Sequence, residues 1–307
     1  MNGSTLLAAL VGPTAVGKTA LSLDLAEALN AEILSCDSMQ VYTSMDIGTA
    51  KPTVKERRGI PHHLIDLVPP TSEFSSADYK RLAVSCIKEV TGRGRLPLFC
   101  GGTGLYLDTV TRVSSLAPDI PAELRDELSK KDGDDLYDEL LRIDPTAAAA
   151  THKNNRKRVI RALELYYGTG KTKTEWDLLS QKEQNPYDTL VFGLDFRCRD
   201  LLYRRIDERV DEMVKDGLIE EVASLPVPLS KTAAQAIGYK EILLYLDGTL
   251  PLSDAIALLK QNTRRYAKRQ LTWFRRDPRV VWFYPDETSR QEIFENIVNI
   301  IRAYLNR

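Results

Sequence analysis

A phosphate-binding loop near the N-terminus constrains this chain more than any other feature. Residues 6–11 are a short apolar run, suited to a buried parallel strand. The eight residues that follow fit the pattern GxxxxGK(S/T): Gly12, Pro13, Thr14, Ala15, Val16, Gly17, Lys18 and Thr19. Leucines at helical spacing come next. Strand, loop and helix together predict an α/β protein whose core is a parallel sheet flanked by helices.

The chemistry of this loop indicates a polyphosphate ligand. Glycines let successive N–H groups point inward, and the N-terminus of the following helix adds about half a positive charge. Lys18 supplies a mobile ammonium, and Thr19 can place its hydroxyl on a Mg²⁺ ion that bridges the phosphates. The loop by itself does not specify which diphosphate or triphosphate binds.

Length and composition are ordinary for a soluble globular protein. A chain of 307 residues can bury a large core, as two domains or as one domain with an insert. No apolar run approaches the roughly 20 residues of a membrane span, and the N-terminus lacks a secretion signal. We therefore expect a cytoplasmic protein with no membrane partner. Its 4 cysteines are scattered without histidines at ligand spacing, which argues against zinc and against a disulfide framework.

Two basic runs stand out in a chain whose net charge is only −1. Residues 153–161 contain five basic residues and no acid, and residues 264–276 contain six basic residues and no acid. Either run alone is consistent with a solvated helix face. Two such runs in a chain that also carries a phosphate loop favour a nucleic-acid partner.

Polar residues follow two further predicted strands, at residues 31–36 and 96–100. In open parallel sheets ligands bind at the carboxyl ends of the strands, so Asp37 should lie beside the phosphate loop. Its chemistry suits a general base or a metal-associated carboxylate, and a helix N-cap is the alternative. After the second strand, glycines stand where a P-loop ATPase would carry an aspartate. They suggest a backbone that approaches a ligand closely, with the Thr103 hydroxyl as a contact, unless the segment is a plain turn.

The middle of the chain predicts a separate helical insert. Residues 113–185 combine charged residues with leucines at helical spacing and show no strand pattern, so we expect a core formed by residues 1–112 and 186–307. The sheet pattern returns at residues 189–196, and a charged helix follows at 199–214. Arg205 lies shortly after the end of that strand, where an arginine can reach toward phosphate.

Taken together, these segments resemble one family, the tRNA dimethylallyltransferases, also called tRNA isopentenyltransferases. The chain lacks the cysteines for the zinc finger of the eukaryotic relatives, so it resembles the shorter bacterial form. The matching blocks follow the family order: GPTAVGKT at 12–19, DSMQVY at 37–42, DIGTAKP at 46–52, GIPHHLID at 59–66, GGTGLY at 101–106, NNRKRVIRALE at 154–164, IGYKE at 237–241 and TRRYAKRQLTWFRR at 263–276.

The resemblance implies transfer of a dimethylallyl group from dimethylallyl diphosphate to a tRNA. The acceptor would be the exocyclic amine of the adenosine 3′-adjacent to the anticodon, in tRNAs that read codons beginning with U. The phosphate loop, Lys18 and a Mg²⁺ ion on Thr19 would stabilise the pyrophosphate as it leaves. Asp37 matches the family's catalytic aspartate, Thr103 a threonine near the reacting amine, and Arg205 an arginine on the pyrophosphate.

The same resemblance implies a grip on the anticodon stem-loop. The target base is stacked and must be swung out, which costs a few kcal/mol that contacts on both sides must offset. Basic residues would bind the phosphates, and Gln40 and Gln270 would hold flanking bases by edge hydrogen bonds. The residues expected to contact tRNA are Asp37, Ser38, Met39, Gln40, Lys157, Arg158, Val159, Ile160, Arg161, Arg264, Lys268, Arg269 and Gln270.

Three alternative functions share parts of this pattern. An adenylate isopentenyltransferase would prenylate free AMP or ATP. A P-loop kinase of nucleosides or small metabolites would turn over ATP and release a phosphorylated product. A noncatalytic RNA-binding switch would change its RNA affinity with nucleotide and make no product. The ordered set of motifs favours tRNA prenylation, whereas the phosphate loop alone does not distinguish these functions.

Overall fold

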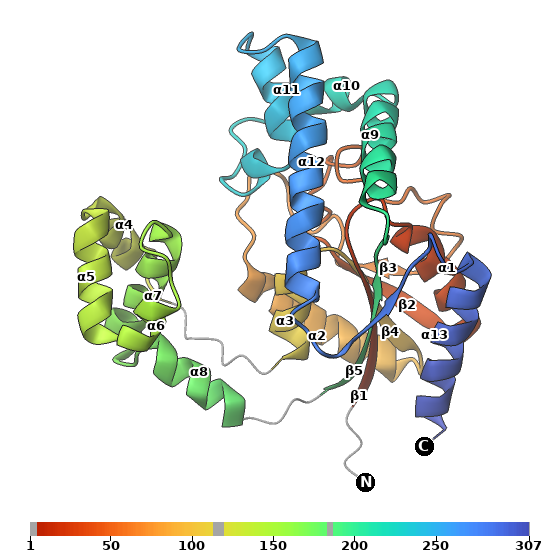
Figure 1. Ribbon diagram of the computed structural model, residues 1–307, viewed down its shortest axis with the longest axis horizontal. Coiled ribbons are helices and arrows are strands. Elements are labelled where there is room, and N and C mark those ends of the chain that lie inside the picture. Colours follow the sequence, from red (N-terminus) through yellow and green to blue (C-terminus); the bar gives the residue numbers. More distant parts are fainter. Residues whose placement is uncertain (1–4, 113–119, 183–186, 307) are drawn as a thin grey trace. The chain divides into compact units, whose positions relative to one another are not determined.

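A computed structural model describes residues 5–112, 120–182 and 187–306 of the chain (Figure 1). The described residues form a six-stranded sheet in which every pairing is parallel, with the strand order β3-β2-β4-β1-β5-β6. This confirms the predicted α/β class. The strands are β1 (Thr5–Val11), β2 (Ala31–Cys36), β3 (His62–His63), β4 (Leu96–Gly101), β5 (Tyr187–Leu194) and β6 (Val280–Phe283).

The central strand β1 shows why these segments form a sheet that is covered on both faces. Side chains alternate along a strand, and both alternating sets in β1 are apolar. Leu7 and Ala9 belong to one buried hydrophobic cluster, whereas Ala8 and Leu10 belong to another. The strand that precedes the phosphate loop is therefore held from both sides.

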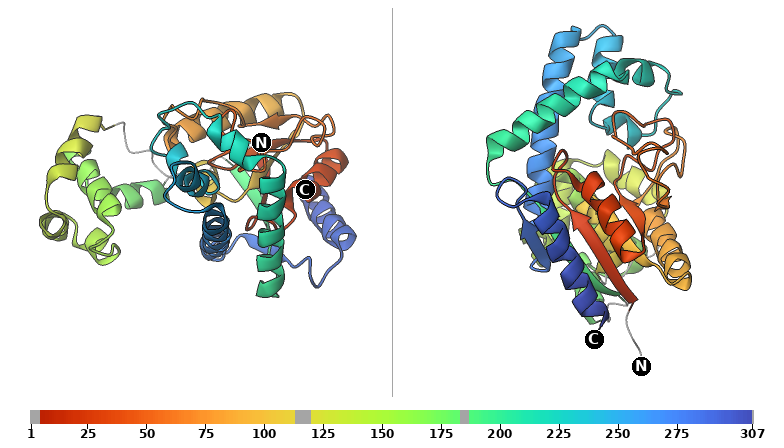
Figure 2. Two further views of the ribbon diagram at one scale, coloured as in Figure 1. Left: turned by 90° about the horizontal axis from the view of Figure 1, so that it is seen from above. Right: turned by 90° about the vertical axis from the view of Figure 1, so that its right-hand side faces the viewer.

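Helices from both ends of the chain cover the two faces. On one face, Leu25 of α1 (Lys18–Leu29) and Ile297 of α13 (Arg290–Leu305) share the cluster of Leu10. Figure 2 shows these two helices side by side. On the other face, Tyr79 of α2 (Ser76–Gly92) and Leu107 of α3 (Gly104–Thr111) pack with Leu7.

The C-terminal half adds a group of helices to the same core. These are α9 (Arg199–Lys215), α10 (Leu218–Ala223), α11 (Tyr239–Leu246) and the long α12 (Leu252–Phe274), with a 3₁₀ turn at Ala233–Gln235. Val210 of α9, Ile242 of α11 and Leu259 of α12 lie in the same hydrophobic cluster as α2 and α3. This packing brings α9 and α12 to the sheet edge where β1, β2 and β4 end.

The chain divides into two compact units, one formed by Met1–Thr111 with Pro186–Arg307 and one formed by Arg112–Asn185. In the second unit the elements that the structure describes are all helices, as predicted: α4 (Ala122–Lys130), α5 (Gly133–Ile143), α6 (Pro145–Ala149), α7 (Arg156–Thr169) and α8 (Lys173–Lys182). This unit has its own hydrophobic core, which includes Leu136, Leu140 and Leu163.

No helix in the described ranges combines the length and the apolar character that a membrane crossing requires.

Candidate active site at the carboxyl ends of the strands

The phosphate loop is held in a conformation that requires glycine at its first position. Gly12 has a φ of +145°, and a Cβ there would lie 2.3 Å from the carbonyl oxygen of Leu194 on the neighbouring strand β5. The loop then enters α1, whose first residue is Lys18. The clashing atoms of Leu194 belong to the backbone of a sheet strand, which cannot shift to make room for a side chain at position 12.

Lys18 lies inside the phosphate loop. Its ammonium donates to the carbonyl oxygens of Gly12 at 3.0 Å and Pro13 at 2.7 Å. The pKa of Lys18 is lowered from 10.5 to about 8, mainly by burial; the charge of Arg209 contributes to this decrease, while Cys100 and Asp37 oppose it. The site therefore holds a cation that is poorly solvated, which a polyphosphate would stabilise.

The site also offers the ligands that a Mg²⁺ ion accepts. Thr19 is the second residue of α1 and is exposed, so its hydroxyl oxygen is accessible at the helix N-terminus. Within the described ranges, no three His, Cys, Asp or Glu side chains form a metal cluster. Mg²⁺ typically keeps few protein ligands and takes the others from phosphates and water. The residues present fit such an ion.

Asp37 follows β2 directly and lies at the site. Its Oδ1 accepts from the backbone N–H groups of Met39 at 2.8 Å and Gln40 at 3.3 Å. These hydrogen bonds resemble those of a helix N-cap, which was the alternative interpretation of Asp37, but they use only one of its two carboxylate oxygens. Oδ2 accepts no hydrogen bond from the described part of the chain, and the Asp37 charge acts on both Lys18 and Arg209. One carboxylate oxygen thus positions the residue and the other stays available to a proton.

Thr103 joins the end of β4 to the Asp37 turn. Its Oγ1 accepts from the N–H of Ser38 at 3.0 Å, and its own N–H donates to the carbonyl of Cys36 at 3.0 Å. The glycines before it serve a purpose other than the one expected. A Cβ on Gly101 would lie 2.1 Å from the Cys36 oxygen, and one on Gly102 would lie 1.9 Å from Gln270 Nε2. These glycines admit neighbouring parts of the protein.

Both glutamines expected to read flanking bases make contacts within the protein. Gln270 is 5% exposed, accepts from Thr14 N at 3.0 Å and donates to the Gly102 carbonyl at 3.0 Å. Gln40 accepts from the Ser35 hydroxyl at 2.8 Å, and its amide donates to two backbone carbonyls. Gln270 thus couples the phosphate loop to the β4–α3 turn, and the half-buried Gln40 binds the backbone of Thr49 and Ala50.

Two arginines one turn apart on α9 face the phosphate loop. Arg205 is exposed, and its Nε donates to the Ala15 carbonyl at 3.0 Å. Arg209 lies deeper: burial lowers its pKa, and the charge of Asp37 partly offsets that change. The sequence interpretation singled out Arg205 only. The spacing of four residues, which places both side chains on one helix face, was the signal that could have identified Arg209.

Tyr266 on α12 is a second residue that the sequence interpretation did not single out. Burial, followed by the nearby Asp37 charge, raises the pKa of its hydroxyl, while the nearby side chains of Thr103 and Gln270 oppose the change. Its position four residues before Gln270 places both on the same face of α12. Tyr266 therefore belongs to the wall around Asp37 and Thr103.

The α7 residues expected to bind tRNA fall into two groups by exposure. Lys157, Arg158 and Arg161 on α7 are exposed. Val159 and Ile160 are 0% and 7% exposed, and their side chains pack in the core of the helical unit and not at the surface where a tRNA contact was expected. These two apolar side chains attach α7 to the core of the unit, while the basic side chains on the other face of the helix point to solvent.

On α12, the predicted basic residues also differ in their contacts. Lys268 and Arg269 are exposed, and the Arg269 guanidinium lies 5.6 Å from the centre of the Tyr266 ring. Arg264 forms an ion pair with Asp207 of α9 at 2.5 Å. Lys268 and Arg269 therefore present their charges at the surface next to the Tyr266 wall, whereas Arg264 connects two helices.

Comparisons with known proteins agree on one family. The sequence model of the family described as IPP transferase matches residues 40–277. The tRNA dimethylallyltransferase of Anoxybacillus flavithermus is 50% identical over 300 residues, which cover 96% of this chain and 94% of that protein.

Solved structures give the same result. The full-length tRNA isopentenylpyrophosphate transferase from Bacillus halodurans is 46% identical with a TM-score of 0.73, and the match covers 98% of this chain and 97% of that one. A eukaryotic dimethylallyltransferase acting on tRNA is 31% identical with a TM-score of 0.86, and the match covers 99% of this chain and 80% of that one.

Proposed function

The chain belongs to the IPP transferase family, and we propose that it transfers a dimethylallyl group from dimethylallyl diphosphate to an adenosine of tRNA. The acceptor is the exocyclic amine of the adenosine 3′-adjacent to the anticodon, in tRNAs that read codons beginning with U. The observation that carries this proposal is the position of Asp37, whose charge acts on the phosphate-loop lysine Lys18. A proton acceptor and a diphosphate site thereby lie within one site.

The donor half of the site consists of the phosphate loop and the two arginines of α9. An allylic diphosphate becomes more negative as its C–O bond breaks, so donors fixed in advance lower the barrier. Lys18, the N-terminus of α1 and Arg209 supply positive charge at this place. Arg205, through its bond to the Ala15 carbonyl, holds the loop and can approach the same phosphates.

The Thr19 hydroxyl would hold a Mg²⁺ ion on the diphosphate, and such an ion neutralises charge on the leaving group. The exposed position of Thr19 at the second residue of α1 supports this assignment. The phosphate loop and the arginines of α9 would bind and orient the donor together with this ion.

The acceptor half consists of Asp37 and Thr103. The adenine amine is a weak nucleophile because its lone pair is shared with the ring, so it needs a base beside it. The amine nitrogen attacks the allylic carbon, the C–O bond breaks with release of pyrophosphate, and Asp37 takes the amine proton. Oδ2 of Asp37 is the oxygen placed for this step, because Oδ1 is held by the N–H groups of Met39 and Gln40.

Basic residues on two helices bind the anticodon stem-loop in this proposal. Lys157, Arg158 and Arg161 of α7, and Lys268 and Arg269 of α12, contact phosphates that flank the target base. The helical unit Arg112–Asn185 is the part that grips tRNA, and the larger unit carries out the chemistry. We expect the protein to act in the cytoplasm, on tRNA.

Incubation with dimethylallyl diphosphate, Mg²⁺ and unmodified tRNA, followed by mass spectrometry of the digested nucleosides, tests this proposal. The expected product is adenosine with one added dimethylallyl group. It should occur only at the position 3′-adjacent to the anticodon, in tRNAs that read codons beginning with U. A matched tRNA with another base at that position is the control acceptor. Free AMP serving as well as tRNA, or ATP turnover with a phosphorylated product, would contradict the proposal.

A further inference from the structure

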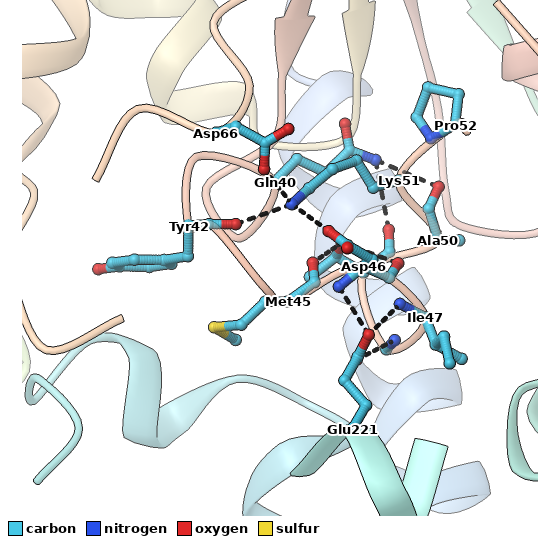
Figure 3. A network of polar contacts seen from close by, with 12 residues as sticks. Gln40, Tyr42, Met45, Asp46, Ile47, Ala50, Lys51, Pro52, Asp66 and Glu221 are labelled. Carbon is cyan, nitrogen blue, oxygen red and sulfur yellow. Dashed lines mark hydrogen bonds and ion pairs between the residues drawn. The ribbon is translucent and has the colours of Figure 1, made fainter. Parts of the chain in front are cut away.

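We propose that Lys51 is a positioning residue for the transfer reaction, which it serves by holding the loops around the Asp37 turn. The inference rests on the proposed function, because it concerns the placement of the proposed base. Lys51 belongs to the loop of residues 46–52, which has no part in the donor or acceptor chemistry described above. Figure 3 shows its side chain among Tyr42, Asp46 and Asp66.

Every proton of the Lys51 ammonium has a partner. The side chain is 3% exposed, and Nζ donates to the Tyr42 carbonyl at 2.8 Å, to Asp46 Oδ1 at 2.5 Å and to Asp66 Oδ1 at 2.6 Å. An ammonium has three donors, so its hydrogen-bonding capacity is used completely (Figure 3). A buried charge with full pairing connects three chain segments, and removal of that charge would leave two carboxylates without their partner.

The segments that Lys51 joins have an unusual backbone. Ser44, Ala50, Leu64 and Asp66 have φ values of 62°, 46°, 63° and 54°, in the left-handed region that residues with a side chain rarely adopt. Such conformations persist only where the surrounding contacts determine them. Asp66 is one of the ion-pair partners of Lys51, and Ala50 directly precedes Lys51 in the chain. The ion pairs of Lys51 therefore stabilise a conformation that the local sequence disfavours.

These loops fix the residues next to the proposed base. The Gln40 amide donates to the carbonyls of Thr49 at 3.3 Å and Ala50 at 3.4 Å, and the Gln40 carbonyl accepts from Asp66 N at 3.0 Å. Gln40 N in turn donates to Asp37 Oδ1. A continuous set of contacts thus runs from Lys51 through both loops to the carboxylate of Asp37.

The other end of the same loop is attached to α10, the helix that follows the arginine-bearing α9. Glu221 of α10 accepts from the N–H groups of Asp46, Ile47 and Gly48 at 2.9, 2.7 and 3.1 Å. Its second partner group is the Tyr239 hydroxyl, at 2.5 Å. Because α10 follows α9 after a short turn, Glu221 links the loop to the helix of Arg205 and Arg209. Lys51 and Glu221 together set the spacing between the base and the diphosphate site.

The expected consequence of loosening this connection is a slower chemical step. Reacting groups must lie within a few tenths of an ångström of their productive positions, and a displacement of about 1 Å costs about 100-fold in rate. The hydrogen bonds and ion pairs of the Lys51 ammonium go to Tyr42, Asp46 and Asp66 and not to the phosphate loop, so donor binding should be unaffected. The two effects can therefore be separated experimentally.

The experiment compares Lys51→Met, which keeps the length of the side chain without its charge, with Lys51→Arg and with Lys55→Met. Lys55 is exposed and lies four residues further along the chain, so it is a matched control for loss of a lysine. Single-turnover transfer to tRNA is measured at saturating donor, below the unfolding temperature of each variant. The concentration of sites is determined by stoichiometric binding of dimethylallyl diphosphate.

We expect Lys51→Met to lower the rate per donor-binding site by about 10- to 100-fold, with an unchanged donor Kd. Lys51→Arg should recover part of the rate, because a guanidinium can still pair with both aspartates, and Lys55→Met should equal the wild type. A purely structural role would lower the number of sites and leave the rate per site intact, which would overturn the inference. A Lys51→Arg rate no higher than that of Lys51→Met would overturn it as well.

Glu221→Gln provides an independent test if Lys51→Met does not fold. It removes the carboxylate charge that faces three N–H groups and should lower the same rate in the same way, again with an unchanged donor Kd. A normal rate in Glu221→Gln would overturn the inference. Wild-type protein that prenylates no tRNA in this assay would instead overturn the proposed function itself.

Discussion

Donor binding should weaken by about tenfold between pH 7 and pH 9, because Lys18 loses its charge in this range. Burial lowers the pKa of Lys18 to about 8, so the side chain is about nine-tenths protonated at pH 7 and about one-tenth at pH 9. If the ammonium is the form that binds the diphosphate, the apparent Kd rises by the ratio of these fractions. Binding stabilises the charged form and must therefore take up protons. Burial also raises the pKa of the nearby Cys100 thiol above its usual value.

Titration calorimetry with dimethylallyl diphosphate, in buffers of different ionisation enthalpy, measures both the Kd and the proton uptake. The last ionisation of the donor's phosphate lies near pH 6, at about the value for phosphate monoesters, so the donor charge is constant over this range. Lys18→Arg keeps a cation at every pH and should show a flat profile, while Lys18→Met should be flat and weaker. A wild-type Kd that is constant from pH 7 to 9, or a Lys18→Arg variant that follows the wild type, would refute the reasoning.

Three further predictions concern the base, the basic helix and the β4 turn. Asp37→Ala should lower the single-turnover transfer rate by about 10²- to 10⁴-fold with an unchanged donor Kd, and a surviving rate would place the base elsewhere. Lys157→Ala and Arg158→Ala should each flatten the log–log salt dependence of tRNA binding by up to about one unit, whereas an unchanged slope would identify a solvated face. Gly101→Ala should lower the midpoint of thermal unfolding by several degrees, because its Cβ would meet the Cys36 carbonyl; an unchanged midpoint would contradict the clash.

Local patterns were sufficient for most of the core architecture. The apolar run before Gly12 predicted β1 because a strand covered on both faces shows no polar alternation. Ser75 and Asp78 form a capping box at the start of α2, a local arrangement that depends only on two residues three positions apart in the sequence. The position of Asp37 beside the phosphate loop followed from a general property of parallel sheets, whose ligands bind where the strands end.

Contacts between distant segments could not be predicted in the same way. Gln270 was expected to face a base, yet it bonds to Thr14, 256 residues away in the chain. Val159 and Ile160 were grouped with their basic neighbours, although helical spacing turns them into the core of the second unit. In each case packing between distant parts of the chain determined which atoms the side chain meets.

The sequence alone thus determined the parallel sheet, the phosphate loop and the family, because these depend on short-range periodicity and on an ordered set of motifs. Only the tertiary structure revealed that Arg209 shares the site with Arg205, that the glycines of the β4 turn clear space for the Cys36 backbone and the Gln270 side chain, and that Lys51 joins three segments. The physical reason is that a side chain's partners are set by the relative placement of whole helices and strands. That placement depends on the burial of all their apolar faces together, and no single window of sequence contains it.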